Sequence, residues 1–201
     1  MELSEAIKGR RSIRNYENKK VEPEKIGMLL EACRWSPSAG NRQPWEVIVV
    51  DDPEIIEKLA RASLDQMWMT TAPVILAMCI NLNIAKGTYG ERSEMYALET
   101  MGMAIQNIML TAYSLGLGTC CVSAFEEDKV SEILKCLDII KPVALITVGY
   151  PAEEPPVPER DDVSRFAHYN SFGKNYETEW PGFERIKNKI KGRLIKSLKN
   201  C

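Results

Sequence analysis

The stretch "RRSIR" at residues 10–14 places three arginines and a serine within five positions of a chain whose net charge is -2. In an extended backbone, side chains alternate between two faces, which puts Arg10, Ser12 and Arg14 on one face and Arg11 on the other. Guanidinium groups beside a hydroxyl group are donors suited to a phosphate, because arginine forms fork-shaped, charge-assisted hydrogen bonds. The five residues taken alone are equally compatible with a solvated surface cluster.

A second candidate is the loop "SPSAGNRQPW" at residues 36–45, where prolines and a glycine favour irregular backbone. Its small residues allow a flat ligand to approach the main chain. The amides of Asn41 and Gln43 offer paired donors and acceptors for the polar edge of a heterocycle. The commoner explanation of such a composition is a loop that joins a helix to a strand.

Motifs for other chemistries are scarce in this sequence. It has no GxGxxG after a strand, no GxxxxGK[ST], no GxSxG and no HExxH. His168 is the only histidine, and we interpret it as structural. The six cysteines form no CxxC pair, which favours free thiols in a reducing compartment over disulfides or a metal site. Cys120 and Cys121 are adjacent, but neighbours on a strand point to opposite faces, so core packing is favoured over a redox pair.

Length and composition are those of an ordinary globular protein. The chain has 201 residues, of which 45% are hydrophobic and 27% charged, enough for one sizeable core. A net charge of -2 gives no reason to expect a nucleic-acid partner, because such proteins usually carry a basic excess. The sequence has no run of about 18 apolar residues, and its first residues lack the apolar segment of a signal peptide, which favours a cytoplasmic location.

Hydrophobic spacing and turn residues predict alternating helices and strands. Helices are expected over residues 3–8, 23–35, 53–64, 93–115 and 127–137, and strands over 45–51, 72–81 and 142–151, with a short strand or turn over 120–125. Residues 82–92 contain two glycines and little periodicity, so they are the candidate lid. Apolar side chains almost encircle the long helix over 93–115, which places it centrally or against another subunit. The pattern predicts a sheet wrapped by helices.

The composition changes after Pro151, where a proline-rich, charged linker is followed by an aromatic-rich segment. We expect the aromatic segment to lie along a surface, such as that of a partner subunit. Residues 183–201 form a basic amphipathic pattern, for which packing on the body or on a partner is favoured over contact with an anionic membrane. The predicted organisation is one domain over residues 1–160 and a C-terminal extension over 161–201.

The ordered set of these segments resembles the nitroreductase family of FMN-dependent oxidoreductases. The likeness begins with residues 6–50, which include both candidate segments, resumes at "APVILAMCI" and "GMAIQNIMLTAYSLGLGTCCVSAF", and ends near "LITVGYPAEEPPVPER". The resemblance implies an α+β fold with a mainly antiparallel β-sheet surrounded by helices. It also implies an intertwined homodimer that holds two FMN molecules at the subunit interface.

The resemblance assigns the basic segment to the phosphate and ribityl chain of FMN. The matching residues are Arg10, Arg11, Ser12 and Arg14. Family members often carry a basic run further along the chain that also reaches the phosphate, whereas this sequence has Arg160, two aspartates and then Arg165. Arg160 is the favoured candidate for this distal contact, and Arg165 is the other.

The resemblance also places residues around the flavin ring. The loop that approaches the ring from the other subunit matches Pro37, Ser38 and Ala39. Asn41 is expected close to the flavin of its own chain, and Gln66 is a candidate for the polar edge of the ring. The backbone that donates near N5 of the ring matches Cys121, Val122 and Ser123.

The implied activity is hydride transfer from NADH or NADPH to N5 of FMN. An electron-poor acceptor, such as a nitroaromatic or a quinone, then replaces the nicotinamide. This ping-pong scheme needs little acid-base chemistry from the protein, which suits a chain with a single histidine. Trp68 and Tyr89 are candidate stacking partners for the acceptor. Open alternatives are a flavin store or redox sensor without turnover, a reductive dehalogenase, a flavin-cleaving enzyme and a membrane-docked redox partner.

Overall fold

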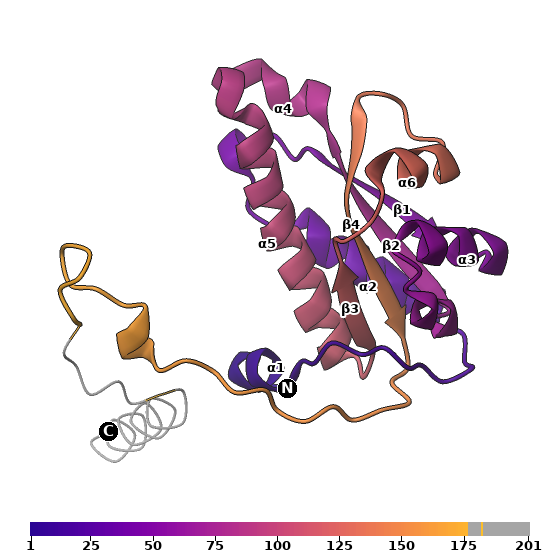
Figure 1. The fold of residues 1–201 in the computed structure, drawn as a ribbon, viewed down its shortest axis with the longest axis horizontal. Helices are drawn as coiled ribbons and strands as arrows, with labels where there is room; N and C mark the ends of the chain where they lie inside the picture. Colours follow the sequence, from indigo (N-terminus) through magenta and orange to yellow (C-terminus); the bar gives the residue numbers. More distant parts are fainter. Residues whose placement is uncertain (177–181, 183–201) are drawn as a thin grey trace, which may run out of the picture. The chain divides into compact units, whose positions relative to one another are not determined.

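The computed structural model describes residues 1–176 and 182. The chain divides into two compact units, Met1–Pro155 and Pro156–Cys201, so the division falls before the boundary expected at residue 160. The first unit contains the sheet and the α-helices that cover it (Figure 1). The basic amphipathic pattern predicted over 183–201 lies outside the described residues.

The first unit is built on a four-stranded sheet in which every neighbouring pair is antiparallel (Figure 1). Its strands are β1 (Trp45–Val50), β2 (Val74–Asn81), β3 (Gly118–Val122) and β4 (Ile140–Gly149), in the spatial order β1-β2-β4-β3. The predicted α+β fold with a mainly antiparallel sheet is confirmed. The strand expected over 120–125 starts earlier, because its pairing with β4 begins at Gly118, opposite Gly149.

With the exception of α4, the helices of this unit match the periodic segments of the sequence. They are α1 (Leu3–Gly9), α2 (Pro23–Arg34), α3 (Pro53–Ala62), α4 (Leu82–Tyr89), α5 (Ser93–Ser114) and α6 (Glu127–Ile133). Helices α2 and α3 begin at a proline, whose fixed φ suits the first helical position. The Asp52 carboxylate caps α3 by accepting a hydrogen bond from Glu54 N at 2.8 Å.

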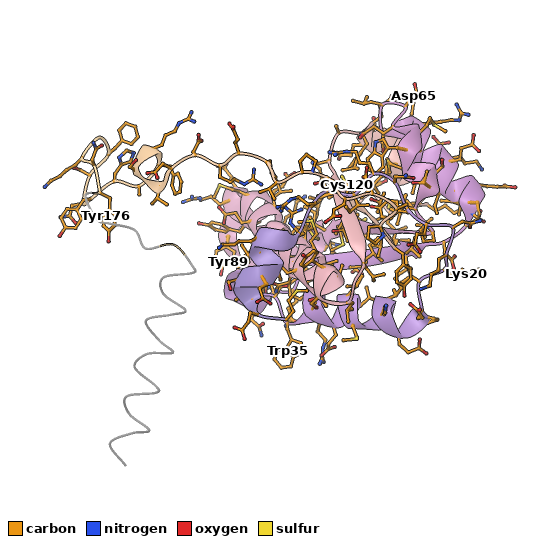
Figure 2. The ribbon with its side chains drawn as sticks, turned by 90° about the horizontal axis from the view of Figure 1, so that it is seen from below. Lys20, Trp35, Asp65, Tyr89, Cys120 and Tyr176 are labelled. Atoms are coloured by element: carbon orange, nitrogen blue, oxygen red, sulfur yellow. The ribbon has the colours of Figure 1, made fainter. Side chains whose placement is uncertain are left out.

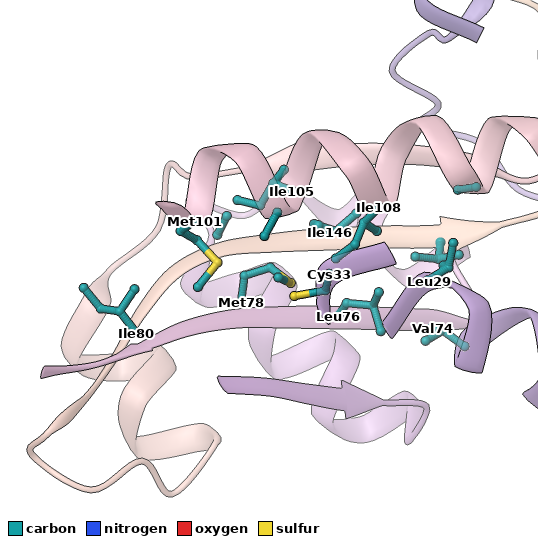
Figure 3. Packing of buried hydrophobic residues seen from close by; sticks show 14 of the residues in the cluster. Leu29, Cys33, Val74, Leu76, Met78, Ile80, Met101, Ile105, Ile108 and Ile146 are labelled. Carbon is teal, nitrogen blue, oxygen red and sulfur yellow. The ribbon is translucent and has the colours of Figure 1, made fainter. Parts of the chain in front are cut away.

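Helices cover both faces of the sheet, because successive side chains of a strand point in opposite directions. Leu76 of β2 belongs to a buried cluster with Leu29 of α2 and Ile108 of α5 (Figure 3). Its neighbour Ile75 belongs to a second buried cluster, with residues of α3 and α6. Burial on both faces explains why the sequence of β2 is apolar without alternation.

Residues 82–92 are mostly helical, although the sequence shows little periodicity there and no helix was expected. They form α4 and a short 3-10 turn, η3 (Gly90–Arg92). The Asn81 side chain accepts hydrogen bonds from the backbone of the first turn of α4 at 3.2 and 3.4 Å, and this cap starts the helix. Gly90 ends it with a φ of 56°, a conformation that glycine adopts without strain. Movement of this segment as a lid stays a prediction.

In the second unit, the described part is mostly irregular. It contains one 3-10 turn, η4 (Val163–Arg165), and a single bridge between His168 and Asn175. His168 contacts Phe172 edge to face, with ring centres 4.7 Å apart, in keeping with its interpretation as structural. Phe166, Tyr169 and Phe172 are exposed within this unit. None of the helices in the described part of the chain is long and apolar enough to span a membrane.

Candidate functional site

The basic segment leaves α1 at Gly9 and runs beside β3 in the extended form that the sequence predicted. Ser12 forms a parallel bridge with Thr119 of β3, and Ile13 N donates to Thr119 O at 3.0 Å. The buried Ile13 side chain lies against Gly118, where a Cβ atom would come within 2.7 Å of Ile13 Cγ1. Glycine at this position therefore lets the segment approach the sheet.

A second contact holds the other end of the segment to the chain that leaves β4. Tyr16 forms an antiparallel bridge with Pro151, and Glu17 N donates to Tyr150 O at 2.9 Å. The buried Tyr16 hydroxyl donates to Ile13 O at 2.7 Å and also lies 2.7 Å from Thr147 Oγ1. Burial raises the pKa of this hydroxyl, so it stays protonated.

Three side chains of the basic segment gather around one buried thiol. Burial raises the pKa of Cys120, while the nearby Arg14 guanidinium, the Ser12 hydroxyl and, after these, Arg10 lower it. An influence of Arg10, Ser12 and Arg14 on one sulfur atom is what a common face, the prediction of the two-residue period, would produce. Cys120 is buried and Cys121 is exposed, so the two cysteines point to opposite faces of β3.

The arginines of this cluster differ in what they contact. Arg11 Nη1 donates to Lys8 O at 2.6 Å and to Arg10 O at 2.7 Å. Among the described residues, neither Arg10 nor Arg14 forms an ion pair, and the Arg14 guanidinium lies 5.8 Å from the centre of the Trp68 ring. Unpaired guanidinium groups beside a hydroxyl form a donor set that suits the phosphate of FMN.

The predicted ring-binding residues on β3 and its neighbours adjoin this cluster. Gln66 Nε2 donates to Ser63 O at 2.9 Å and to Ala124 O at 3.4 Å, which places its amide beside the end of β3. Trp68, on the 3-10 turn η2 (Met67–Thr71), packs against the buried Ile13, Tyr16 and Ala72. Around that strand end, Cys121 and Ser123 are exposed and Val122 is buried. Gln66 thus lies beside the residue that follows the 121–123 backbone, and Trp68 contacts the basic segment.

The loop over residues 37–43 is held at the first half of α5. Ala39 N donates to Thr100 Oγ1 at 3.3 Å. The loop contains a 3-10 turn, η1 (Ala39–Asn41), in which Gly40 and Asn41 both have a φ of 55°. Gln43 also has a positive φ, 52°, and its amide donates to Asn41 Oδ1 at 3.2 Å. Positive φ at two non-glycine residues stores strain of the kind that collects at ligand sites.

A cavity of about 420 Å³ opens between this loop and the α4–α5 junction. Its lining is Pro37, Ser38, Ala39, Tyr89, Tyr96, Glu99, Thr100 and Met103. Tyr89 and Tyr96 pack edge to face with ring centres 5.0 Å apart. Tyr89 was predicted as a stacking residue, whereas Tyr96 and Glu99 were missed. The sequence feature that could have identified them is the helical spacing of Tyr96, Glu99 and Met103, which puts all three on one face of α5.

The two candidate surfaces lie at opposite ends of α5 in this chain. Thr100 contacts the loop near one end, while Tyr113 lies at the other end against Gly9, just before the basic segment. A helix rises about 1.5 Å per residue, so positions 100 and 113 are about 20 Å apart. In Figure 1, α4 and α1 flank opposite ends of α5, and Figure 2 shows Tyr89 and Cys120 well separated.

Asn41 lies on the loop side of this separation. Asn41 ends the same turn as Ala39, so it lies with the loop at the Thr100 end of this separation. This placement groups Asn41 with Pro37, Ser38 and Ala39. Its contact with the flavin of its own chain stays a prediction.

The downstream arginines belong to the second unit. Arg165 Nη1 pairs with the Asp161 carboxylate. Arg160 Nη1 donates to the Glu159 carbonyl at 3.2 Å and forms no ion pair within the described residues. An arginine already paired with a carboxylate is a weaker phosphate ligand, so the preference for Arg160 stands as a prediction.

Comparisons with known proteins agree with these features. The sequence matches the Nitroreductase family over residues 7–70 and 65–150. An NADH dehydrogenase of Thermus thermophilus is 33% identical over 173 residues, covering 72% of this chain and 84% of the relative. An FMN reductase (NAD(P)H) of Bacillus subtilis is 30% identical over 166 residues, covering 76% of this chain and 67% of the relative. The crystal structure of a nitroreductase family protein from Clostridium novyi NT is 26% identical, with a TM-score of 0.70, and covers 88% of this chain and 97% of that one.

Proposed function

The chain belongs to the nitroreductase family, and we propose that it uses NADH or NADPH, through bound FMN, to reduce electron-poor acceptors such as nitroaromatics and quinones. FMN, when bound, supplies the ring atom that takes up a hydride and passes electrons on. The family membership and the relatives named FMN reductase and NADH dehydrogenase support this class of activity. The acceptors and the ping-pong order are our proposal.

The observation that carries the proposal is the cluster formed by Arg10, Ser12 and Arg14. These residues alternate along an extended segment that β3 and the exit of β4 hold in place, and all three lower the pKa of the buried Cys120 thiol. Since the Arg10 and Arg14 guanidinium groups form no ion pair in the described part of the chain, their charges are free to bind a phosphate. Gln66 and the backbone of 121–123 would then face the flavin ring.

We propose further that the functional unit is a homodimer. The loop over 37–41 contacts α5 at Thr100, and the basic segment follows Gly9 at Tyr113, so these two contacts are about 20 Å apart along α5. In a dimer, the loop of one copy would complete the site on the other. Met95, Leu98 and Met103 are exposed on α5 in the single chain, and a partner that covers them would gain apolar burial.

The cavity at Tyr89 and Tyr96 is our candidate for the place where reductant and acceptor bind in turn. An edge-to-face aromatic pair offers a stacking surface for a nicotinamide or a flat acceptor. One shared place would produce the ping-pong order, because the first product must leave before the acceptor binds. The protein then contributes orientation and electrostatics and no proton-transfer residue.

The five described cysteines are free thiols. Free thiols suit a reducing compartment, which supports the expectation of a cytoplasmic protein.

Anaerobic reduction is the test of the proposed activity. The purified protein is expected to be yellow, to lose its flavin absorbance on addition of NADH or NADPH, and to regain it with menadione or a nitroaromatic. A bound flavin that stays oxidised with both nicotinamides would refute the reductase and leave a flavin store or sensor. A protein that binds no FMN would refute both.

A further inference from the structure

Glu153 lies just beyond β4, and its side chain reaches the backbone of the basic segment. Its Oε1 atom accepts hydrogen bonds from Arg14 N and from Asn15 N, the second at 3.2 Å. On either side, the segment is held by main-chain hydrogen bonds, from Ile13 to β3 and from Glu17 to the residue after β4. Between these flanks, Ala152 N donates to Asn15 O at 3.0 Å, and the Glu153 carboxylate accepts the backbone N–H groups of Arg14 and Asn15.

We propose that Glu153 is a positioning residue for phosphate recognition: its carboxylate fixes the backbone at Arg14 and so aims this arginine at the phosphate of the flavin. The inference rests on the proposed FMN site. It concerns this chain's own contact and assigns Glu153 no contact with the flavin.

The charge of Glu153 argues for a role through hydrogen bonding. A carboxylate close to a phosphate site opposes phosphate binding by Coulomb repulsion, so its charge alone would weaken the site. Glu153 also forms no ion pair with the Arg14 guanidinium, although it binds the backbone of the same residue. In the described structure, the carboxylate acts on the main chain and leaves the guanidinium free.

This geometry predicts a particular order among variants. Glu153→Ala removes the acceptor and releases two backbone N–H groups, so the affinity for FMN is expected to fall roughly 3- to 10-fold, the effect of about one hydrogen bond. Glu153→Gln keeps a carbonyl acceptor and removes the charge, so it is expected to bind FMN at least as well as the unmodified protein. Glu154→Ala is the matched control, because Glu154 is the neighbouring exposed acid and has no hydrogen bond in the described structure.

Riboflavin provides a second comparison, because it has the ring of FMN without the phosphate. Glu153→Ala is expected to change riboflavin affinity less than twofold. Equal losses for FMN and riboflavin would mean a general role in folding and would overturn the proposal. So would tighter FMN binding by Glu153→Ala, which would mark the carboxylate as a competitor of the phosphate.

Amide hydrogen exchange, measured by NMR on the full chain without flavin, separates this proposal from the proposed function. Exchange at Arg14 and Asn15 is expected to be faster in Glu153→Ala than in the unmodified protein and in Glu154→Ala, with Glu153→Gln close to the unmodified rate. Unchanged exchange in Glu153→Ala overturns the positioning role even if FMN binds. Absence of FMN binding by the unmodified protein would instead refute the proposed function, whatever the exchange rates.

Discussion

Replacement of single arginines in the basic segment tests the phosphate site most directly. Arg10 is half-buried and Arg14 is exposed, and neither forms an ion pair within the described residues. Arg10→Ala and Arg14→Ala are therefore expected to remove a contact to the ligand without breaking an ion pair within the described residues. Arg11 differs, because its guanidinium already binds two backbone carbonyl groups.

The size of the effect follows from the burial of each side chain. A hydrogen bond to a charged group contributes about 1.5 to 3 kcal/mol, which corresponds to a change in Kd of roughly 10- to 150-fold. Arg10 should lie in the upper part of this range because it is half-buried, and Arg14 near the lower end because solvent screens an exposed charge. Arg11→Ala should weaken FMN binding less than threefold. It should instead lower Tm, because it removes contacts at the end of α1.

The assay is a titration of FMN fluorescence with flavin-free protein, together with a thermal melt of each variant. Arg34→Ala is the charge control, because Arg34 pairs with Glu31 at 2.6 Å on the surface of α2 and its loss changes the net charge equally. FMN binding at unmodified affinity by Arg10→Ala and Arg14→Ala would refute the phosphate assignment. If Arg11→Ala or Arg34→Ala lost as much FMN affinity, the effect would be a general consequence of the changed net charge, not of a specific phosphate contact.

Three further predictions concern the loop, the strand end and the acid range. Gly40→Ala should lower stability by about 1 to 2 kcal/mol, because alanine is strained at a φ of 55°, and its Cβ atom would lie 2.6 Å from Tyr89 Oη; a thermal melt and the KM for a nitroaromatic would both respond. Iodoacetamide should alkylate the exposed Cys121 in the flavin-free protein, and bound FMN should protect it, as measured by mass spectrometry. Equal labelling with and without FMN would refute the assignment of Cys121 to the flavin-ring site. The Tyr150 hydroxyl holds the pKa of Glu22 below its ordinary value, so this contact stabilises the fold above about pH 4.5 and is lost as pH falls through the lowered pKa. Tyr150→Phe should therefore flatten the fall of Tm between about pH 5 and pH 3, and an unchanged profile would contradict this.

Much of the fold could be predicted because local signals and tertiary packing agree. Pro23 and Pro53 mark helix starts that the structure contains, and the unbroken apolar run of β2 indicated burial on both faces. The region over 82–92 was misjudged because its helix depends on a side-chain cap at Asn81 and on the packing of α4 against α5. Hydrophobic periodicity carries neither signal.

The residue types of the candidate site could be proposed from the sequence, whereas most of the contacts that hold them could not. Alternation along the basic segment predicts one face for Arg10, Ser12 and Arg14, and in the structure all three influence the Cys120 thiol. Tyr96 was missed because a helix that is apolar nearly all round hides which of its faces borders a cavity. Glu153 was missed because its partners are backbone N–H groups of a segment far away in sequence. Every residue except proline has such a group, so the residue types do not show which one a side chain binds.

The length and burial of α5 decide how the two candidate surfaces can cooperate. They lie at opposite ends of this helix, and its middle is fixed in the core by Met101, Ile105 and Ile108. Bringing them together within one chain would require the helix to break, which would expose these buried side chains at a cost of about 1.5 to 3 kcal/mol each. A second copy brings a loop to the basic segment without any such change. A variant that keeps the protein monomeric is therefore expected to lose FMN ring contacts from residues 37–41 while its basic segment still binds phosphate. Separate measurements of the affinities of such a monomer for FMN and for inorganic phosphate would distinguish a flavin site shared by two chains from one contained in a single chain.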